Sequence, residues 1–127
     1  MFDSYDGKST EAYIESADGG NCIDAGGCPV EATLKVLGGK WKILILFHLD
    51  GNSKRFSELK RSIPGITEKM LTQQLKELET DGVVNRKVYP QVPPKVEYSI
   101  TKYGKTLQPV IKSMCKWGME HRKRVRT

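Results

Sequence analysis

Four glycine-containing turns divide residues 28 to 82 into short segments. The turns are Gly38-Gly39, Asp50-Gly51, Pro64-Gly65 and Asp81-Gly82. Glycine and proline in such pairs interrupt helices and strands and favour turns. This part of the chain therefore has to fold as several short elements packed on one another.

The first of these segments have patterns typical of short helices. Residues 29 to 37 carry apolar side chains at helical spacing after a proline that suits the first helical position. The run Trp41 to Leu49 is nearly all apolar, which fits either a buried helix or a buried strand, and we favour the helix. Residues 54 to 56 can form a very short strand, after which Ser57 can cap a helix that ends at Ile63.

A longer helix and a hairpin are expected next. Thr67 can cap a helix with leucines at 71, 75 and 78 along one stripe, and Asp81-Gly82 ends it. Two β-like runs, Val83 to Tyr89 and Lys95 to Ile100, follow and are joined by a proline-rich loop. Helix, tight turn, helix and hairpin in this order predict a mostly α-helical fold with a small β-wing, a winged helix-turn-helix.

The C-terminal segment has the pattern of one long amphipathic helix. Thr101 is expected to cap it, and Pro109 should either bend it or mark its true first turn. One side carries Leu107, Val110, Ile111, Met114, Trp117 and Gly118. This stripe could fold back on the core of its own chain. We favour a second subunit and expect a homodimer through the terminal helices, because no later element remains to cover the stripe.

Charge is unevenly distributed along the 127 residues. Residues 1 to 27 have a net charge of −5, and the remainder has a net charge of +11. We expect residues 1 to 25 to form a flexible acidic arm and residues 26 to 127 to form the single folded domain. Solvated surface lysines would explain the basic part, but a compact basic domain also attracts polyanions, so nucleic acid or an anionic membrane face is the first partner class to consider.

Several classes of protein are disfavoured. There is no apolar run of about 18 residues and no basic-then-apolar leader, so we expect a cytoplasmic protein without a membrane partner. Three cysteines suggest free thiols in a reducing compartment, and no cysteine and histidine set has zinc spacing. We expect no metal, no cofactor and no enzymatic activity. A small thiol oxidoreductase is the enzyme alternative, but the chain has no C-x-x-C pair.

Polar residues opposite the leucine stripe are candidates for reading DNA, although an ordinary solvated helix face has the same pattern. They are Lys69, Thr72, Gln73, Lys76 and Thr80. Glutamine and lysine can hydrogen-bond to purine edges, and threonine can contact a thymine methyl. Neighbouring candidates are Arg55, Ser57, Lys60 and Arg61 around the preceding helix and Arg86, Lys87, Gln91 and Lys95 on the wing. Cations placed there can hold phosphates on both sides of a groove.

Several sequence blocks in one register resemble the HxlR-type family of winged-helix regulators, which is related to the MarR group. The blocks are Cys28-Pro29-Val30-Glu31-Ala32, Leu37-Gly38-Gly39-Lys40-Trp41, Arg55-Phe56-Ser57-Glu58-Leu59, Ile63-Pro64-Gly65-Ile66, Pro93-Pro94-Lys95-Val96-Glu97-Tyr98 and Thr101-Lys102-Tyr103-Gly104. The resemblance covers residues 28 to 118. It implies a homodimeric bacterial transcription regulator that acts at palindromic or pseudo-palindromic sites in double-stranded DNA. A winged-helix module used only for protein contacts is the alternative.

Cys28 is a candidate redox sensor. It precedes the first helix, whose positive end lowers the pKa of a thiol, and Lys35, Lys40 and Lys42 could add to this effect. Many proteins of the family that the chain resembles look to be thiol switches with a cysteine at this position.

Cys115 lies on the expected dimer helix, so a disulfide between Cys28 of one chain and Cys115 of the other is conceivable. Both cysteines could instead be small packed residues. Cys22, in the acidic arm, is a weaker candidate.

Overall fold

The computed structural model describes residues 27–126, which divide after Gly38 into two units. In the first unit, helix α2 (Pro29–Leu37) begins after Cys28 and ends before the two glycines, as predicted. The backbone N–H of Ala32 donates to the carbonyl of Cys28 at 3.1 Å, which closes the first turn. The expected acidic arm and Cys22 lie outside the described residues, and the domain boundary after residue 25 stays a prediction.

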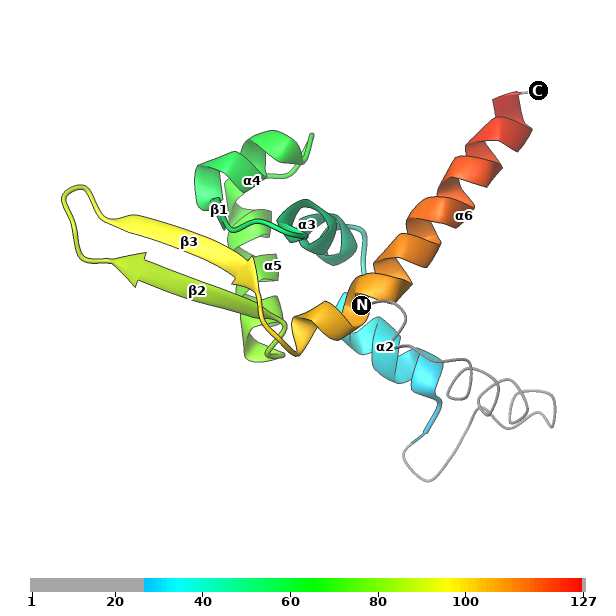
Figure 1. The fold of residues 1–127 in the computed structure, drawn as a ribbon, viewed down its shortest axis with the longest axis horizontal. Helices are drawn as coiled ribbons and strands as arrows, with labels where there is room; N and C mark the ends of the chain where they lie inside the picture. The colour runs from blue at the N-terminus through cyan, green and yellow to red at the C-terminus, as the bar shows by residue number, and fades with distance from the viewer. Residues whose placement is uncertain (1–26, 127) are drawn as a thin grey trace. The chain divides into compact units, whose positions relative to one another are not determined.

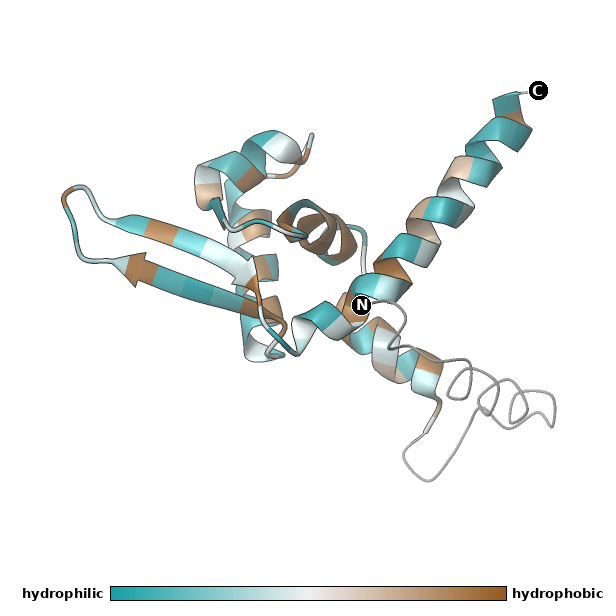
Figure 2. Ribbon diagram, in the orientation of Figure 1, coloured by the Kyte–Doolittle hydropathy of each residue, from teal (hydrophilic) through white to brown (hydrophobic). Residues whose placement is uncertain are grey.

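Three helices form the core of the second unit. They are α3 (Trp41–Leu49), α4 (Phe56–Ser62) and α5 (Glu68–Thr80). The apolar run from Trp41 is a helix, as we favoured, and Figure 2 shows it brown along its length. The side chains that are almost completely buried are Ile45, Leu46, Leu49, Leu59, Ile63, Leu71, Leu75 and Leu78. The predicted leucine stripe of α5 thus packs into a core shared with α3 and α4.

An antiparallel three-stranded sheet lies beside these helices (Figure 1). The strands β1 (Lys54–Arg55), β2 (Val84–Tyr89) and β3 (Lys95–Ile100) have the order β1-β3-β2. Val84 pairs with Ile100 at the base of the hairpin, where Val84 is buried, and Tyr89 pairs with Lys95 at its far end. The hairpin therefore attaches through its base and projects its far end, as expected of a wing.

The start of α4 differs from the prediction. Ser57 does not cap this helix, because strand β1 ends at Arg55 and the helix begins at the next residue. The backbone of Arg55 is still extended, and its N–H donates to Oε1 of Glu58 at 2.7 Å. A carboxylate three residues into the helix therefore provides the cap that we had assigned to a serine hydroxyl.

The start of the C-terminal helix also differs. Thr101 does not cap an α-helix, because a short 3-10 helix, η2 (Gly104–Leu107) with Tyr103 as its N-cap residue, follows it and the α-helix α6 (Gln108–Arg126) begins only after η2. The hydroxyl of Thr101 accepts from the N–H of Gly104 at 2.9 Å and donates to the carbonyl of Gly82 at 2.6 Å. Pro109 is the second residue of α6, so it marks the first turn of this helix and does not bend it.

The two ends of α6 have different surroundings. Ile111, near its start, is buried, whereas Met114 and Trp117 are 51% and 69% exposed further along. The rings of Trp117 and His121 stack with their centroids 5.0 Å apart. The exposed apolar side chains of α6 are therefore left without a covering layer from the rest of the second unit.

Among the helices of residues 27–126, including α6, none has the length and apolar character needed to cross a bilayer.

Candidate DNA interface

Helix α5 presents a polar outer face. Thr67 accepts from the N–H of Met70 at 3.0 Å and so begins the helix where the sequence predicted. Because Leu71, Leu75 and Leu78 are buried, the opposite side of the helix faces outward. All five predicted reading residues are exposed there: Lys69, Thr72, Gln73, Lys76 and Thr80. The structure brings these side chains onto one face, and their contact with bases stays a prediction.

The predicted flanking residues lie on the elements before and after this helix. On β1 and α4, Arg55, Ser57 and Arg61 are exposed, and Lys60 is half-buried. On the wing, Arg86, Lys87 and Gln91 are exposed, and Lys95 is half-buried. Cations and hydrogen-bond donors are therefore present on the elements that precede α5 and on those that follow it in the sequence.

A cluster of side chains around Tyr89 makes Lys95 a weaker candidate for a phosphate contact than the sequence indicated. The hydroxyl of Tyr89 donates to Glu97 at 3.0 Å, and the ammonium of Lys95 lies 3.3 Å from the same carboxylate. The Tyr89 hydrogen bond, followed by Lys95, holds the pKa of Glu97 below its usual value. Lys87 and Lys95 both place their ammonium groups over the Tyr89 ring, at 5.0 and 4.8 Å from its centroid. Lys95 is thus already balanced by a carboxylate, and Lys87 is the better candidate for a phosphate contact.

Sequence reasoning missed a network that joins the core to the outer face of α5. Lys42 on α3 is buried, and its Nζ lies 2.6 Å from Oε1 of Glu77 on α5. Oε2 of Glu77 accepts from Nε2 of Gln73 at 3.2 Å. Hydrogen bonds from Lys42, first, and from Gln73 lower the pKa of Glu77.

The ammonium of Lys42, which we expected to support a thiolate at Cys28, is engaged by Glu77, because α3 packs against α5. An effect of Lys42 on Cys28 stays a prediction. The available signal was a single lysine within the apolar run Trp41 to Leu49. A buried ammonium needs an anionic partner, but the sequence does not show which carboxylate supplies it.

The two cysteines of the described residues lie in separate units. Cys28 is half-buried at the N-cap of α2, and Cys115 is exposed on α6. Neither forms a disulfide within residues 27–126. Their pairing across two chains stays a prediction.

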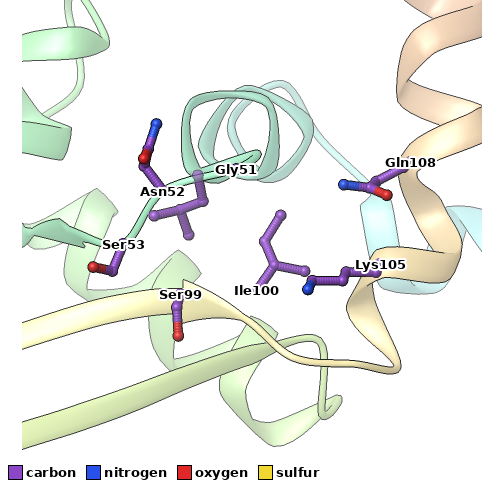
Figure 3. A pocket seen from close by; sticks show the side chains of 8 residues that line it. Gly51, Asn52, Ser53, Ser99, Ile100, Lys105 and Gln108 are labelled. Carbon is purple, nitrogen blue, oxygen red and sulfur yellow. The ribbon is translucent and has the colours of Figure 1, made fainter. Parts of the chain in front are cut away.

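A small pocket lies between the turn after α3, the end of β3 and the start of α6 (Figure 3). Lys105 and Gln108 point toward it, whereas the Ser99 hydroxyl and the Asn52 amide point away. The amide nitrogen of Gln108 is bonded, since its Nε2 donates to Oδ1 of Asp50 at 2.5 Å, whereas its Oε1 is buried without a hydrogen-bond partner. Within residues 27–126, no group of three or more His, Cys, Asp or Glu side chains could hold a metal ion.

A second helix anchored by leucines, a tight turn before it and a basic hairpin after it define the winged helix-turn-helix class. The family model described as HxlR-like helix-turn-helix matches residues 36–126, and the chain belongs to this family. The resemblance seen in the sequence and the predicted fold class are both confirmed.

Three relatives support this assignment. The HTH-type transcriptional regulator YdeP of Bacillus subtilis is 56% identical over 102 residues, which cover 80% of each chain. The redox regulator HypR in its reduced form is 53% identical, with a TM-score of 0.73 over 77% of this chain and 97% of that chain. In its oxidised form HypR is 56% identical, with a TM-score of 0.71 over 73% and 96%. The chain is therefore a transcriptional regulator of the helix-turn-helix type and not an enzyme.

Proposed function

We propose that this regulator binds double-stranded DNA sequence-specifically, with α5 lying in the major groove. The observation that carries the proposal is the outer face of α5, where five residues able to contact bases or phosphates are exposed together. The buried leucines on the opposite side hold this face in place. A rigid helix with such a face fits the groove, which is wide enough to admit an α-helix.

The flanking cations support this proposal. Residues 28 to 127 have a net charge of +11, and exposed arginines and lysines lie on α4 and on the wing. Such side chains neutralise phosphates and set the register of a reading helix without reading the sequence. We assign this role to Arg55, Lys60, Arg61, Arg86 and Lys87.

The regulator acts as a homodimer in this proposal. Met114 and Trp117 on α6 are the apolar side chains that a second copy would cover. A two-fold dimer would place its two α5 helices about 34 Å apart, in successive major grooves, and would match a palindromic or pseudo-palindromic operator.

A gel-shift titration with the DNA upstream of the protein's own gene tests the proposal. We expect binding to this fragment that survives an excess of random competitor DNA and weakens between 50 and 200 mM salt, by about 10³-fold or more for six or more phosphate contacts. Equal affinity for the fragment and the competitor would contradict sequence-specific binding. Absence of binding to both would favour the alternative, a winged-helix module that contacts an acidic protein.

Two substitutions distinguish base reading from phosphate contact. We expect Gln73→Ala to weaken binding to the preferred site by about 1–3 kcal/mol and to relax the sequence preference. Lys87→Ala should weaken binding to all DNA sequences alike. It should also reduce the slope of the logarithm of affinity against the logarithm of salt concentration by about one. Affinities for the preferred site and for random DNA, measured at several salt concentrations, check both. Equal effects of the two variants on both DNAs would contradict the placement of α5 in the groove.

We also propose that oxidation of Cys28 controls DNA binding. Cys28 is the N-cap residue of α2, where the helix N-terminus favours the thiolate, and it is only half-buried. The similar protein HypR is described as a redox regulator and has both a reduced and an oxidised form. A bond or adduct at this position would change DNA affinity by shifting the spacing of the two reading helices.

The redox proposal is tested by DNA binding before and after a mild thiol oxidant, and again after reductant. We expect the oxidant to change the affinity of the wild type reversibly and to leave Cys28→Ser unchanged. Cys115→Ser serves as the matched control, and a response like that of Cys28→Ser would assign it the partner thiol. If the wild type and Cys28→Ser respond equally, the signal does not enter at Cys28.

A further inference from the structure

The buried ammonium of Lys42 keeps the carboxylate of Glu77, on helix α5, ionised. The Lys42 side chain is only 9% exposed, and its Nζ lies 2.6 Å from Oε1 of Glu77. An ammonium held away from water requires an anion beside it, so Glu77 stays ionised and close to Lys42. The Glu77 side chain is itself 43% exposed, which leaves its second oxygen at the surface of α5.

This second oxygen orients the amide of Gln73. Oε2 of Glu77 accepts a hydrogen bond from Nε2 of Gln73 at 3.2 Å. An ionised carboxylate can only accept hydrogen bonds. The amide nitrogen of Gln73 must therefore face Glu77, and its carbonyl oxygen must point away. Without Glu77, the amide could turn over and exchange the positions of its donor and its acceptor.

The direction of this amide matters at a base edge. Glutamine recognises adenine by accepting from the N6 amino group and donating to N7 at the same time. The order of donor and acceptor along the amide has to match their order along the base. Nε2 carries two hydrogens, so one remains for a base after Glu77 has taken the other.

We propose that Lys42 and Glu77 are positioning residues that determine which base edge Gln73 reads, by holding its side-chain amide in one direction. This inference rests on the proposed DNA binding through α5. The chemistry of recognition is a bidentate contact with a purine edge in the major groove, adenine being the base that matches glutamine. Lys42 acts here from beneath the reading helix.

Selection of binding sites from a randomised double-stranded DNA library by the full chain, followed by sequencing, tests the inference. The base pair at which Gln73→Ala loses its preference identifies the position that Gln73 reads. We expect Glu77→Gln to reduce discrimination at that same position by about fivefold, because a bidentate contact discriminates only when donor and acceptor are both in place. Preferences at the other positions should be retained.

Two further variants test whether the effect comes from the orientation of the Gln73 amide, from a change of charge on α5, or from a failure to fold. Glu79→Gln removes the same charge from an exposed position of the same helix and should leave the preferences unchanged. Lys42→Met removes the buried charge with little change of volume. It should reduce the base preference at the same position as Glu77→Gln does. Thermal denaturation identifies any variant that fails to fold, and Glu77→Gln, at a partly exposed position, carries the test if Lys42→Met does not fold.

The outcomes distinguish this inference from the proposed function. If the wild type selects a site and Glu77→Gln keeps the full preference at the Gln73 position, DNA reading stands and the role of Lys42 and Glu77 is overturned. An equal loss in Glu79→Gln would overturn it as well, because the effect would then come from charge alone. If the wild type enriches no sequence, the proposed function fails and the inference fails with it.

Discussion

Replacing Gly104 by alanine should lower the free energy of unfolding by about 3 kcal/mol, the upper part of the range for an overpacked site. Gly104 is buried at the start of η2. A Cβ atom there would lie 2.3 Å from the carbonyl oxygen of Val83 and 2.7 Å from Cγ2 of Ile100. The first of these atoms belongs to the backbone beside strand β2, so it cannot move aside without disturbing the sheet. Urea denaturation of both proteins at one protomer concentration measures the difference.

Lys105→Ala is the matched control for this prediction. Lys105 is the next residue of η2 and is exposed, so its replacement should change the free energy of unfolding by no more than about 0.5 kcal/mol. If Gly104→Ala is as stable as Lys105→Ala, the close approach of η2 to Val83 does not exist in the folded protein.

The surroundings of Gly104 also connect α5 to α6. Thr101 donates from its backbone N–H to Val83 and from its hydroxyl to Gly82, the two residues after Asp81, which is the C-cap of α5. Its hydroxyl also accepts from Gly104, just before α6 begins. The closely packed turn from Thr101 to Gly104 therefore joins the end of α5 to η2, which leads into α6. This gives a physical reason for one sequence block on which the family resemblance was based.

Local signals were sufficient to predict α5 and the wing. The Thr67 cap, the leucine stripe and the turn at Gly82, whose φ of 79° favours glycine, all act within a few residues of the helix they define. The exposed reading face followed directly, because the residues opposite a buried stripe must face outward. The helix from Trp41 to Leu49 needed one further assumption, since its composition also fits a strand.

Contacts between distant residues were not predictable in the same way. Thr101 does not cap the C-terminal helix, because its hydroxyl bonds to Gly82, nineteen residues earlier, and to Gly104 at the start of η2. The Glu77 partner of Lys42 was not predicted, because only the packing of α3 on α5 brings these two residues together. In both cases the residue types allowed several partners, and the tertiary fold selected one of them.

Trp117→Glu should convert the protein to a monomer and weaken operator binding by about 10²-fold or more. Trp117 is 69% exposed on α6, and a carboxylate placed on an apolar face that a second copy covers would be buried without a partner. A monomer engages one half-site only, so it loses the joint affinity of two linked reading helices. Light scattering at micromolar concentration reports the mass, and a gel shift with the selected operator reports the affinity.

Lys116→Glu is the control that makes this prediction specific to the apolar side of α6. Lys116 is the neighbouring residue and is exposed, and at about 100° per residue it lies on the side of the helix away from the stripe. It introduces the same glutamate with a larger change of net charge, so general electrostatic effects would be greater in this variant than in Trp117→Glu. We expect Lys116→Glu to remain a dimer. If the wild type is itself a monomer, or if both variants stay dimeric, the subunits do not meet through Trp117, and another surface would have to set the spacing of the two α5 helices.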